Sequence, residues 1–458
     1  MPSLRVLVLV LAAVTALAAE KPPKPNVILL LADDLRWNTL GYAGDAKVQT
    51  PNIDRLAAKG AMFRNAFVTT SICCVSRASI LTGQWERRHH IVDFETPLTA
   101  EQWAQTYPAL LRKAGYRTGF VGKFGVGSAK DVAAMAESFD FWKGRPGQAG
   151  AEFFEKNDPT HTHATARFGN EALEFLKSCP AGQPFCLSLS FNAVHARDGK
   201  PREYTPDSRD ENLYAGVTIP LPPLATTAAF QRLPAFVQTS EGRRRWNWRF
   251  DSEEKAQATL RDYYRLITGV DREVGRIVEE LEKSGRAEDT VIIFTSDNGY
   301  ALGDRGLADK WFAYEEDMRV ALVIHDPRQP ARTVEEVALN VDLAPTMLDI
   351  AGVPVPGQMQ GRSLLPLVRG EKPPAPWRTE FFYEHHSVPD RIPPVEAFRT
   401  ARWKYIRWLA QPGHGAVEEL YDLASDPGEE RNLAGEESSR AALEEMRGKW
   451  ERAGAELR

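Results

Sequence analysis

The chain has 458 residues, of which 43% are hydrophobic and 26% are charged, and its formal net charge at pH 7 is −5. This length and balance predict one large core with a smaller companion domain. The mild acidity, without any dense run of Lys and Arg, excludes a nucleic acid as the partner.

The first residues carry the pattern of a signal peptide, which spans residues 1–19. Arg5 precedes an apolar run at 6–17, and the small residues Ala16 and Ala18 provide a cleavage site. The run is shorter than the roughly 20 residues of a membrane helix, and no later stretch approaches that length. We therefore expect an exported protein without a membrane span, located in the periplasm or outside the cell.

Four continuous apolar runs predict buried strands of a parallel or mixed sheet, because strands covered on both faces show little polar alternation. These runs span residues 26–31, 116–121, 185–191 and 290–295. Helices are expected at 50–59, at a segment that ends with 110–114, at 260–281 and at 341–351. Residues 144–169 and 199–252 are predicted to be mostly loop, and long loops are commonly functional.

The chain is expected to form two units after the signal peptide, a catalytic domain at 24–365 and a smaller subdomain at 366–458. The second unit is predicted to be antiparallel and to end in a helix at 438–453. Its expected strands lie at 380–383, 397–400, 403–408 and 419–423.

Polar residues follow each of the four predicted strands. They are Asp33, Asp34, Lys123, His195, Asp297 and Asn298. Because sites in open α/β sheets form at the carboxyl ends of the strands, we expect these side chains to share one crevice. Each has a simpler explanation on its own, since Asp and Asn often form turns or caps and Lys is usually solvated. Three carboxylates and one amide oxygen favour Ca²⁺ or Mg²⁺ over zinc.

Residues 71–84 contain a distinctive short pattern. In order, it includes Cys73, Cys74, Ser76, Arg77, Thr82 and Gly83. A helix is predicted from Ser76 onward, so that Cys73 would lie on the loop before it. There the helix N-terminus favours anions and a thiol would be partly exposed and reactive. The alternative is that both cysteines are small buried hydrophobic residues.

The remaining two cysteines, Cys179 and Cys186, flank a predicted turn. Export makes a disulfide between them feasible. Because Cys186 also begins an apolar strand, a reduced and buried cysteine is the alternative.

The pattern from Cys73 to Gly83 resembles the signature of the type I, formylglycine-dependent sulfatases, of the alkaline phosphatase-like superfamily. The family pattern is Cys-x-Pro/Ala-x-Arg followed by Thr-Gly or Leu-Gly, so alignment on Arg77 makes Cys73 the modified residue. Further similar segments lie at 26–34, 50–54, 115–123, 296–299 and 309–310. The resemblance implies an α/β fold in which helices flank both faces of a large mixed β-sheet. It also implies a smaller C-terminal α+β subdomain with an antiparallel sheet.

The resemblance also implies the roles of the site residues. Formylglycine, made from Cys73 by a maturation enzyme, would attack sulfur through one hydroxyl of its hydrated aldehyde, and the other hydroxyl would release the sulfate. Arg77 would stabilise the formylglycine, Lys123 and Lys310 would bind sulfate oxygens, and His195 would protonate or hydrogen-bond the leaving oxygen. The metal, Ca²⁺ with Mg²⁺ as the alternative, would be held by Asp33, Asp34, Asp297, Asn298 and residue 73.

Two positions depart from the family pattern. Val75 stands where Pro or Ala is usual, and Gly125 stands where many members have the histidine that takes the hydroxyl proton during aldehyde regeneration. Candidate substitutes are His89 and, from the second unit, His385 or His386. Without such a substitute, we expect slower regeneration.

The leading hypothesis is a sulfuric ester hydrolase, an arylsulfatase-like sulfatase that acts on a sulfated saccharide. The Trp- and Arg-rich residues 232–250 suit such a ligand, although ordinary packing of that segment is the alternative. The competing hypotheses are a phosphate or phosphonate monoester hydrolase of the same superfamily, and a sulfated-glycan-binding protein in which Cys73 is never converted.

Overall fold

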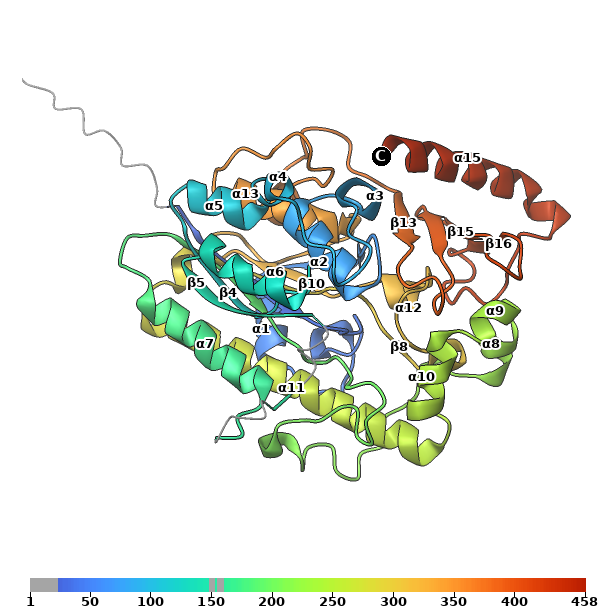
Figure 1. Ribbon diagram of the computed structural model, residues 1–458, viewed down its shortest axis with the longest axis horizontal. Helices are drawn as coiled ribbons and strands as arrows, with labels where there is room; N and C mark the ends of the chain where they lie inside the picture. The colour runs from blue at the N-terminus through green and yellow to red at the C-terminus, as the bar shows by residue number, and fades with distance from the viewer. Residues whose placement is uncertain (1–23, 148–152, 155–159) are drawn as a thin grey trace, which may run out of the picture.

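The computed structural model describes residues 24–147, 153–154 and 160–458 (Figure 1). The predicted signal peptide at 1–19 lies outside the described residues, as does part of the predicted loop at 144–169. None of the described helices is both long and apolar enough to cross a membrane.

An eight-stranded sheet forms the centre of the molecule, with the strand order β11-β2-β10-β7-β1-β6-β4-β5. Its strands are β1 (Asn26–Ala32), β2 (Ala61–Phe63), β4 (Arg117–Lys123), β5 (Phe141–Arg145), β6 (Phe185–Ser190), β7 (Thr290–Ser296), β10 (Leu322–His325) and β11 (Arg332–Val334). β1 lies parallel to β6 and β7, and β4 is parallel to β6, whereas β10 is antiparallel to β7. The four predicted strands are the contiguous centre of this mixed sheet, and the shorter strands around them are not predicted.

Alternate residues of β1 face opposite layers of helices. Ile28 and Leu30 belong to one apolar core, while Val27, Leu29 and Leu31 belong to another. The first core is covered by α1 (Pro51–Lys59), α7 (Ala164–Ser178) and α11 (Glu253–Lys283), and the second by α2 (Cys73–Thr82), α5 (Tyr107–Lys113) and α13 (Leu343–Ile350) (Figure 1). The expected α/β fold, with helices on both faces of the sheet, is confirmed.

Helix α11 is longer than predicted, because it begins at Glu253 rather than near residue 260. The side chain of Ser252 accepts a hydrogen bond from the backbone N–H of Lys255 and so caps the helix. Glu253 and Glu254 in the first turn suit the positive end of the helix dipole. These polar turns precede the apolar periodicity on which the prediction rested.

Residues 199–252 are more helical than predicted. They include α8 (Thr227–Gln231), α9 (Ala235–Gln238) and α10 (Glu241–Arg249). α10 escapes prediction because it has little apolar periodicity, and its buried Arg249 is held by ion pairs. Similarly, α7 begins at Ala164, inside the predicted loop at 144–169.

The C-terminal part contains a separate four-stranded antiparallel sheet with the order β13-β14-β15-β16. Its strands are β13 (Phe381–His385), β14 (Val395–Arg399), β15 (Trp403–Trp408) and β16 (Val417–Asp422), and α15 (Arg440–Glu456) packs on them. Phe382 and Trp408 of this sheet share an apolar core with Ile72 and Val75 at the start of α2. The expected α+β subdomain is confirmed, whereas its boundary at 365/366 stays a prediction.

Two small strand pairs and several short helices connect these layers. β3 (Ala66–Phe67) pairs with β12 (Ala338–Leu339), and β8 (Ala301–Leu302) pairs with β9 (Ala308–Asp309). The short helices are α3 (Glu86–His89), α4 (Ala100–Trp103), α6 (Ala129–Ala134), α12 (Glu315–Met318) and α14 (Leu365–Arg369).

Candidate active site

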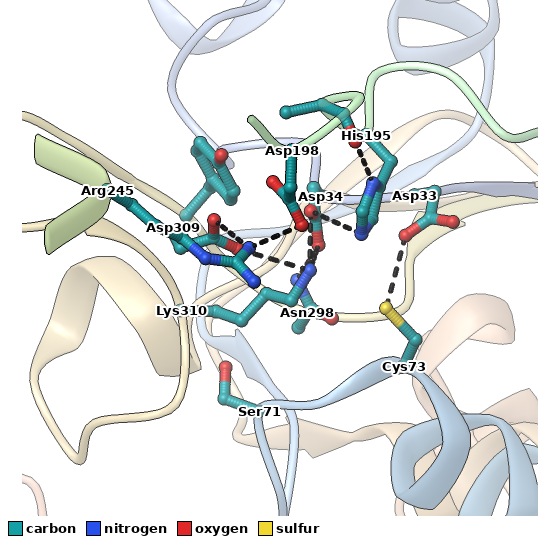
Figure 2. Close-up of polar contacts among 12 residues, drawn as sticks. Asp33, Asp34, Ser71, Cys73, His195, Asp198, Arg245, Asn298, Asp309 and Lys310 are labelled. Atoms are coloured by element: carbon teal, nitrogen blue, oxygen red, sulfur yellow. Dashed lines mark hydrogen bonds and ion pairs between the residues drawn. The ribbon is translucent and has the colours of Figure 1, made fainter. Parts of the chain in front are cut away.

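The polar residues that follow the central strands converge at the carboxyl end of the sheet, as predicted (Figure 2). The backbone N–H of Asp33 donates to the carbonyl of Ala193 at 3.0 Å, and that of Asp297 donates to the carbonyl of Ala32 at 3.1 Å. These bonds continue the strand pairing beyond β1, β6 and β7. The backbone at Asp33 and Asp297 is therefore held in place by the sheet.

Cys73 is the first residue of α2, not a loop residue before it. Its side chain is buried, and the sulfur lies 3.3 Å from Asp33 Oδ1 (Figure 2). Burial raises the pKa of the Cys73 thiol well above its usual value, and Asp33 adds to the rise while Lys123 and Lys310 offset part of it. The prediction of a partly exposed, reactive thiol is therefore wrong.

Three buried carboxylates and one amide lie beside Cys73: Asp33, Asp34, Asp297 and Asn298. Asn298 Nδ2 donates to Asp34 Oδ1 at 2.7 Å, while its Oδ1 is buried without a hydrogen-bond partner among the described residues. One ligand atom each from Asp33, Asp34, Cys73 and His195 lies within 4.8 Å of the others. Burial raises the pKa of Asp297 to about 6, with Asp33 adding to the rise. The group within 4.8 Å holds two carboxylates, and Asp297, which pairs with Arg77, is not part of it. The buried oxygens of Asp33, Asp34 and Asn298 suit a hard divalent cation.

Three buried cations surround the carboxylates. Arg77 Nε donates to Asp297 Oδ2 at 2.8 Å, and the same guanidinium donates to the backbone oxygen of Lys123. Lys123 Nζ lies 2.6 Å from Asp33 Oδ2, and Lys310 Nζ lies 2.5 Å from both oxygens of Asp34. Burial alone would lower the pKa of each lysine, but the facing carboxylates more than reverse this and raise it. Both lysines are therefore charged at neutral pH.

His195 enters the site from the segment after β6. Its Nδ1 lies 2.6 Å from the backbone oxygen of Ala196 and serves as the donor to it, so the imidazole orientation is fixed. This leaves Nε2 toward the site, 3.6 Å from Asp34 Oδ2 (Figure 2). A ring nitrogen in this position is able to exchange a proton with a bound ligand.

A pocket of about 230 Å³ opens above these groups, with Cys73, His195 and Lys310 among its lining residues. The residues of its outer wall are not predicted as site residues, because they come from segments far apart in the chain. They include Phe94, Asp198, Glu241, Arg245, Trp311 and Arg391. The sequence signal nearest to them is the Trp- and Arg-rich stretch at 232–250, which contains Glu241 and Arg245.

Neither His89 nor His385 lines this pocket among the described residues. His89 is buried in α3, where its Nε2 bonds with Ser79 Oγ at 3.1 Å and its Nδ1 accepts from the backbone N–H of Ile91. His385 is buried in β13. His386 pairs with Glu86 at 2.6 Å. The structure thus brings no substitute histidine from these positions to Cys73.

The predicted disulfide candidates are both free thiols. Cys186 is buried in β6, as the alternative expectation had it. The Cys179 sulfur lies 3.3 Å from the backbone oxygen of Phe175.

Comparison with protein families identifies the family of the chain. The model described as Sulfatase matches residues 25–353, and one described as N-sulphoglucosamine sulphohydrolase, C-terminal, matches residues 303–455. The two matches together span both the central sheet and the C-terminal sheet.

Similar proteins point the same way. The N-acetylglucosamine-6-O-sulfatase of Bacteroides thetaiotaomicron is 28% identical over 507 residues, with 94% of this chain and 87% of that protein covered. The arylsulfatase of Clostridium perfringens is 26% identical, with 93% of each covered. A solved structure in complex with its substrate D-glucosamine-2-N,6-O-disulfate is 27% identical, with a TM-score of 0.80, and covers 95% of this chain and 98% of its own. The chain therefore belongs to the sulfatase family, within the alkaline phosphatase-like superfamily, and is a sulfuric ester hydrolase.

Proposed function

We propose that the chain is an exported sulfatase that removes sulfate from a sulfated saccharide. Its nucleophile would be formylglycine, made from Cys73 by a maturation enzyme. The observation that carries this proposal is the position of Cys73, which begins α2 at the base of the pocket with His195 and Lys310. A thiol with so high a pKa stays protonated and is a weak nucleophile, so conversion to an aldehyde would make this position chemically useful.

The residues present fit a hard divalent cation. Asn298 Oδ1, the buried amide oxygen without a hydrogen-bond partner in the described chain, is a free ligand atom beside Asp34. The cation, Ca²⁺ or Mg²⁺, would be held by Asp33, Asp34, Asp297, Asn298 and residue 73. When bound, it would lower the pKa of a coordinated hydroxyl and neutralise charge on the sulfate.

The buried cations would stabilise the transition state. Lys123 and Lys310 hold fixed charge beside residue 73, where charge grows on the sulfate oxygens during transfer. Arg77 binds Asp297 and the backbone of Lys123, so it orders a metal ligand and a sulfate-binding lysine together. All three cations are buried, and electrostatic stabilisation of a transition state is strongest where water is excluded.

His195 would carry the protons. Because Nδ1 is occupied by the backbone oxygen of Ala196, Nε2 is the atom that donates a proton to the leaving saccharide oxygen. The neutral Nε2 that results would then accept the proton from the remaining hydroxyl of residue 73. We assign both transfers to one nitrogen because His195 is the histidine that lines the pocket among the described residues.

A saccharide substrate and export are supported by separate observations. Two of the similar proteins carry names or substrates of the sulfated glucosamine class. Trp311 and Phe94 line the pocket and offer aromatic surface to a sugar ring. The signal-peptide pattern at 1–19 supports a location in the periplasm or outside the cell.

The test compares kcat/KM on an aryl sulfate, the matched aryl phosphate and a 6-O-sulfated N-acetylglucosamine. We expect the two sulfates to be hydrolysed faster than the phosphate, and Cys73→Ala to abolish turnover. Cys74→Ala is the matched control, since it alters a buried neighbour in the same helix turn and should retain activity. A faster phosphate reaction would favour the phosphatase hypothesis. Saccharide binding without turnover would favour the binding-protein hypothesis.

A further inference from the structure

The outer wall of the pocket includes a loop that the C-terminal subdomain contributes. Residues 387–392 follow β13, and Val388, Arg391 and Ile392 line the pocket. Ser387 Oγ donates to the backbone oxygen of Val92 at 2.6 Å. The backbone N–H of Glu241 in α10 donates to the backbone oxygen of Arg391 at 3.2 Å. The loop is thus attached to two other segments of the rim, and the backbone of Arg391 has a defined place there.

Most of the charge at the rim is already paired. Arg245 contacts carboxylates of Asp309 at 2.6 Å, Asp198 at 2.8 Å and Glu241 at 3.1 Å. Glu241 receives a second arginine, Arg244, at 3.2 Å. These groups satisfy one another and leave little net charge for a ligand.

Arg391 differs from every other cation of the pocket wall. Its side chain is exposed, and within the described chain it makes no ion pair and no side-chain hydrogen bond, including with the adjacent Asp390. A planar guanidinium binds sulfate and carboxylate groups through two parallel N–H bonds. The wall beside it contains the apolar side chains of Val388 and Ile392, which suit the face of a sugar ring.

We propose that Arg391 binds a second anionic group of the substrate, a sulfate or carboxylate other than the sulfate that is removed. The enzyme then selects saccharides that carry two anionic groups over those with one. This inference rests on the proposed sulfatase function and assigns the substrate class of the same site. Arg391 acts in recognition and not in the chemical step, because the reacting groups stand at the base of the pocket.

The test measures kcat and KM of the wild type, Arg391→Gln and Arg391→Lys on three probes. The probes are N-acetylglucosamine 6-O-sulfate, D-glucosamine-2-N,6-O-disulfate and a singly sulfated disaccharide with a uronic acid. For Arg391→Gln we expect kcat/KM to fall about 10- to 100-fold on a doubly anionic probe, mainly through KM, and to stay unchanged on the first. Arg391→Lys should fall in between, since it keeps the charge and loses the planar fork. The probe whose kcat/KM falls most in Arg391→Gln shows whether the second anion lies on the sulfated sugar itself or on the neighbouring sugar.

Arg431→Gln is the matched control, because Arg431 is an exposed arginine of the same subdomain whose partner is Glu436. It should change none of the three rates. Equal losses on all three probes in Arg391→Gln, or no loss on any, would overturn the inference while leaving the sulfatase function intact. If the wild type hydrolyses neither these saccharides nor an aryl sulfate, the proposed function itself fails and the inference falls with it.

Discussion

Position 125 shows how a single residue is constrained by one neighbour. Gly125 has a φ of +78°, and a Cβ added to it would lie 2.7 Å from Cδ of Arg77. Arg77 in turn holds Asp297 and the backbone of Lys123. A side chain at 125 would therefore displace Arg77, which orders Asp297 and Lys123. For this reason, a histidine at position 125 does not fit this site as it does in the family motif.

We predict that Gly125→His lowers kcat instead of raising it. Gly125→Ala isolates the cause when it is compared with Gly115→Ala, because Gly115 has a φ of +91° and open space around its Cα. Both alanines carry a backbone cost of about 1–3 kcal/mol, but only the first meets Arg77. Melting temperatures and kcat of the three variants provide the measurement. A Gly125→His enzyme with a higher kcat than the wild type would contradict this account of the site.

At the scale of elements, α10 holds the turn that carries Lys310. Asp309 and Trp311, on either side of Lys310, have φ values of +84° and +101°, which are strained for residues other than glycine. Arg245 and Arg249 of α10 both bind Asp309 Oδ2, at 2.6 and 2.8 Å. This helix, which lies in a segment that the sequence predicts to be mostly loop, thus supports the turn of Lys310.

Arg249→Met should therefore weaken both the fold and the reaction. Arg249 is 1% exposed and also pairs with Asp198 and Glu203. Its removal leaves the buried Glu203 without an ion pair and Asp309 with one arginine fewer, at a cost of about 3–5 kcal/mol. We expect kcat to fall as well, because the turn around Lys310 loses its support. Arg244→Met, on the exposed side of the same helix, should cost less than about 1 kcal/mol. Denaturant unfolding and kcat distinguish them, and similar effects of the two substitutions would refute the assigned role.

At the scale of the whole molecule, several ionisable groups are buried in their neutral form. Burial lowers the pKa of His89 and His385 to about 3 and that of His163 to about 4. Such histidines stabilise the fold fully above their unfolded pKa of 6.5, and this contribution is lost as pH falls below it. Burial raises the pKa of Glu384 to about 7, which acts in the opposite direction over part of the same range. The contribution of one histidine to stability is therefore best measured as the difference in free energy of unfolding between the wild type and a variant of that histidine.

The stability gap between the wild type and His89→Asn should narrow on acidification. At pH 7.5 the variant lacks the bonds to Ser79 and Ile91, but at pH 5 the wild type has lost about 2 kcal/mol of the His89 contribution. Ser79→Ala is the control, because it removes the hydrogen bond to His89 while the buried ring remains. The difference in stability between the wild type and Ser79→Ala should therefore stay nearly constant with pH. The free energies of unfolding at several pH values test this. A gap for His89→Asn that does not change with pH would count against a neutral buried ring.

The sequence predicts the strands and the site residues best where a long apolar run or the residues directly after it define the feature. The continuous apolar runs located β1, β4, β6 and β7, and the polar residues after them meet as expected. The start of α2 was misplaced because its N-cap residue is Ile72, which provides no capping side chain, and the helix is buried along its whole length. The helix is then stabilised by tertiary packing, which cannot be predicted from the helix propensity of its own residues. The pocket rim, from Asp198 to Arg391, joins distant segments, and the Trp- and Arg-rich stretch at 232–250 is the one local signal that touches it.

The most direct test of the central claim is the mass of the tryptic peptide 65–77, from protein produced in a host that has a formylglycine-generating system. We predict an aldehyde in place of the thiol at Cys73, with Cys74 unchanged. A Val75→Pro variant and a known sulfatase in the same host serve as controls. Proline should be tolerated at 75, since the first N–H groups of a helix lack intrahelical partners. A thiol at 73 in both the wild type and this variant, with the known sulfatase converted, would contradict the formylglycine mechanism.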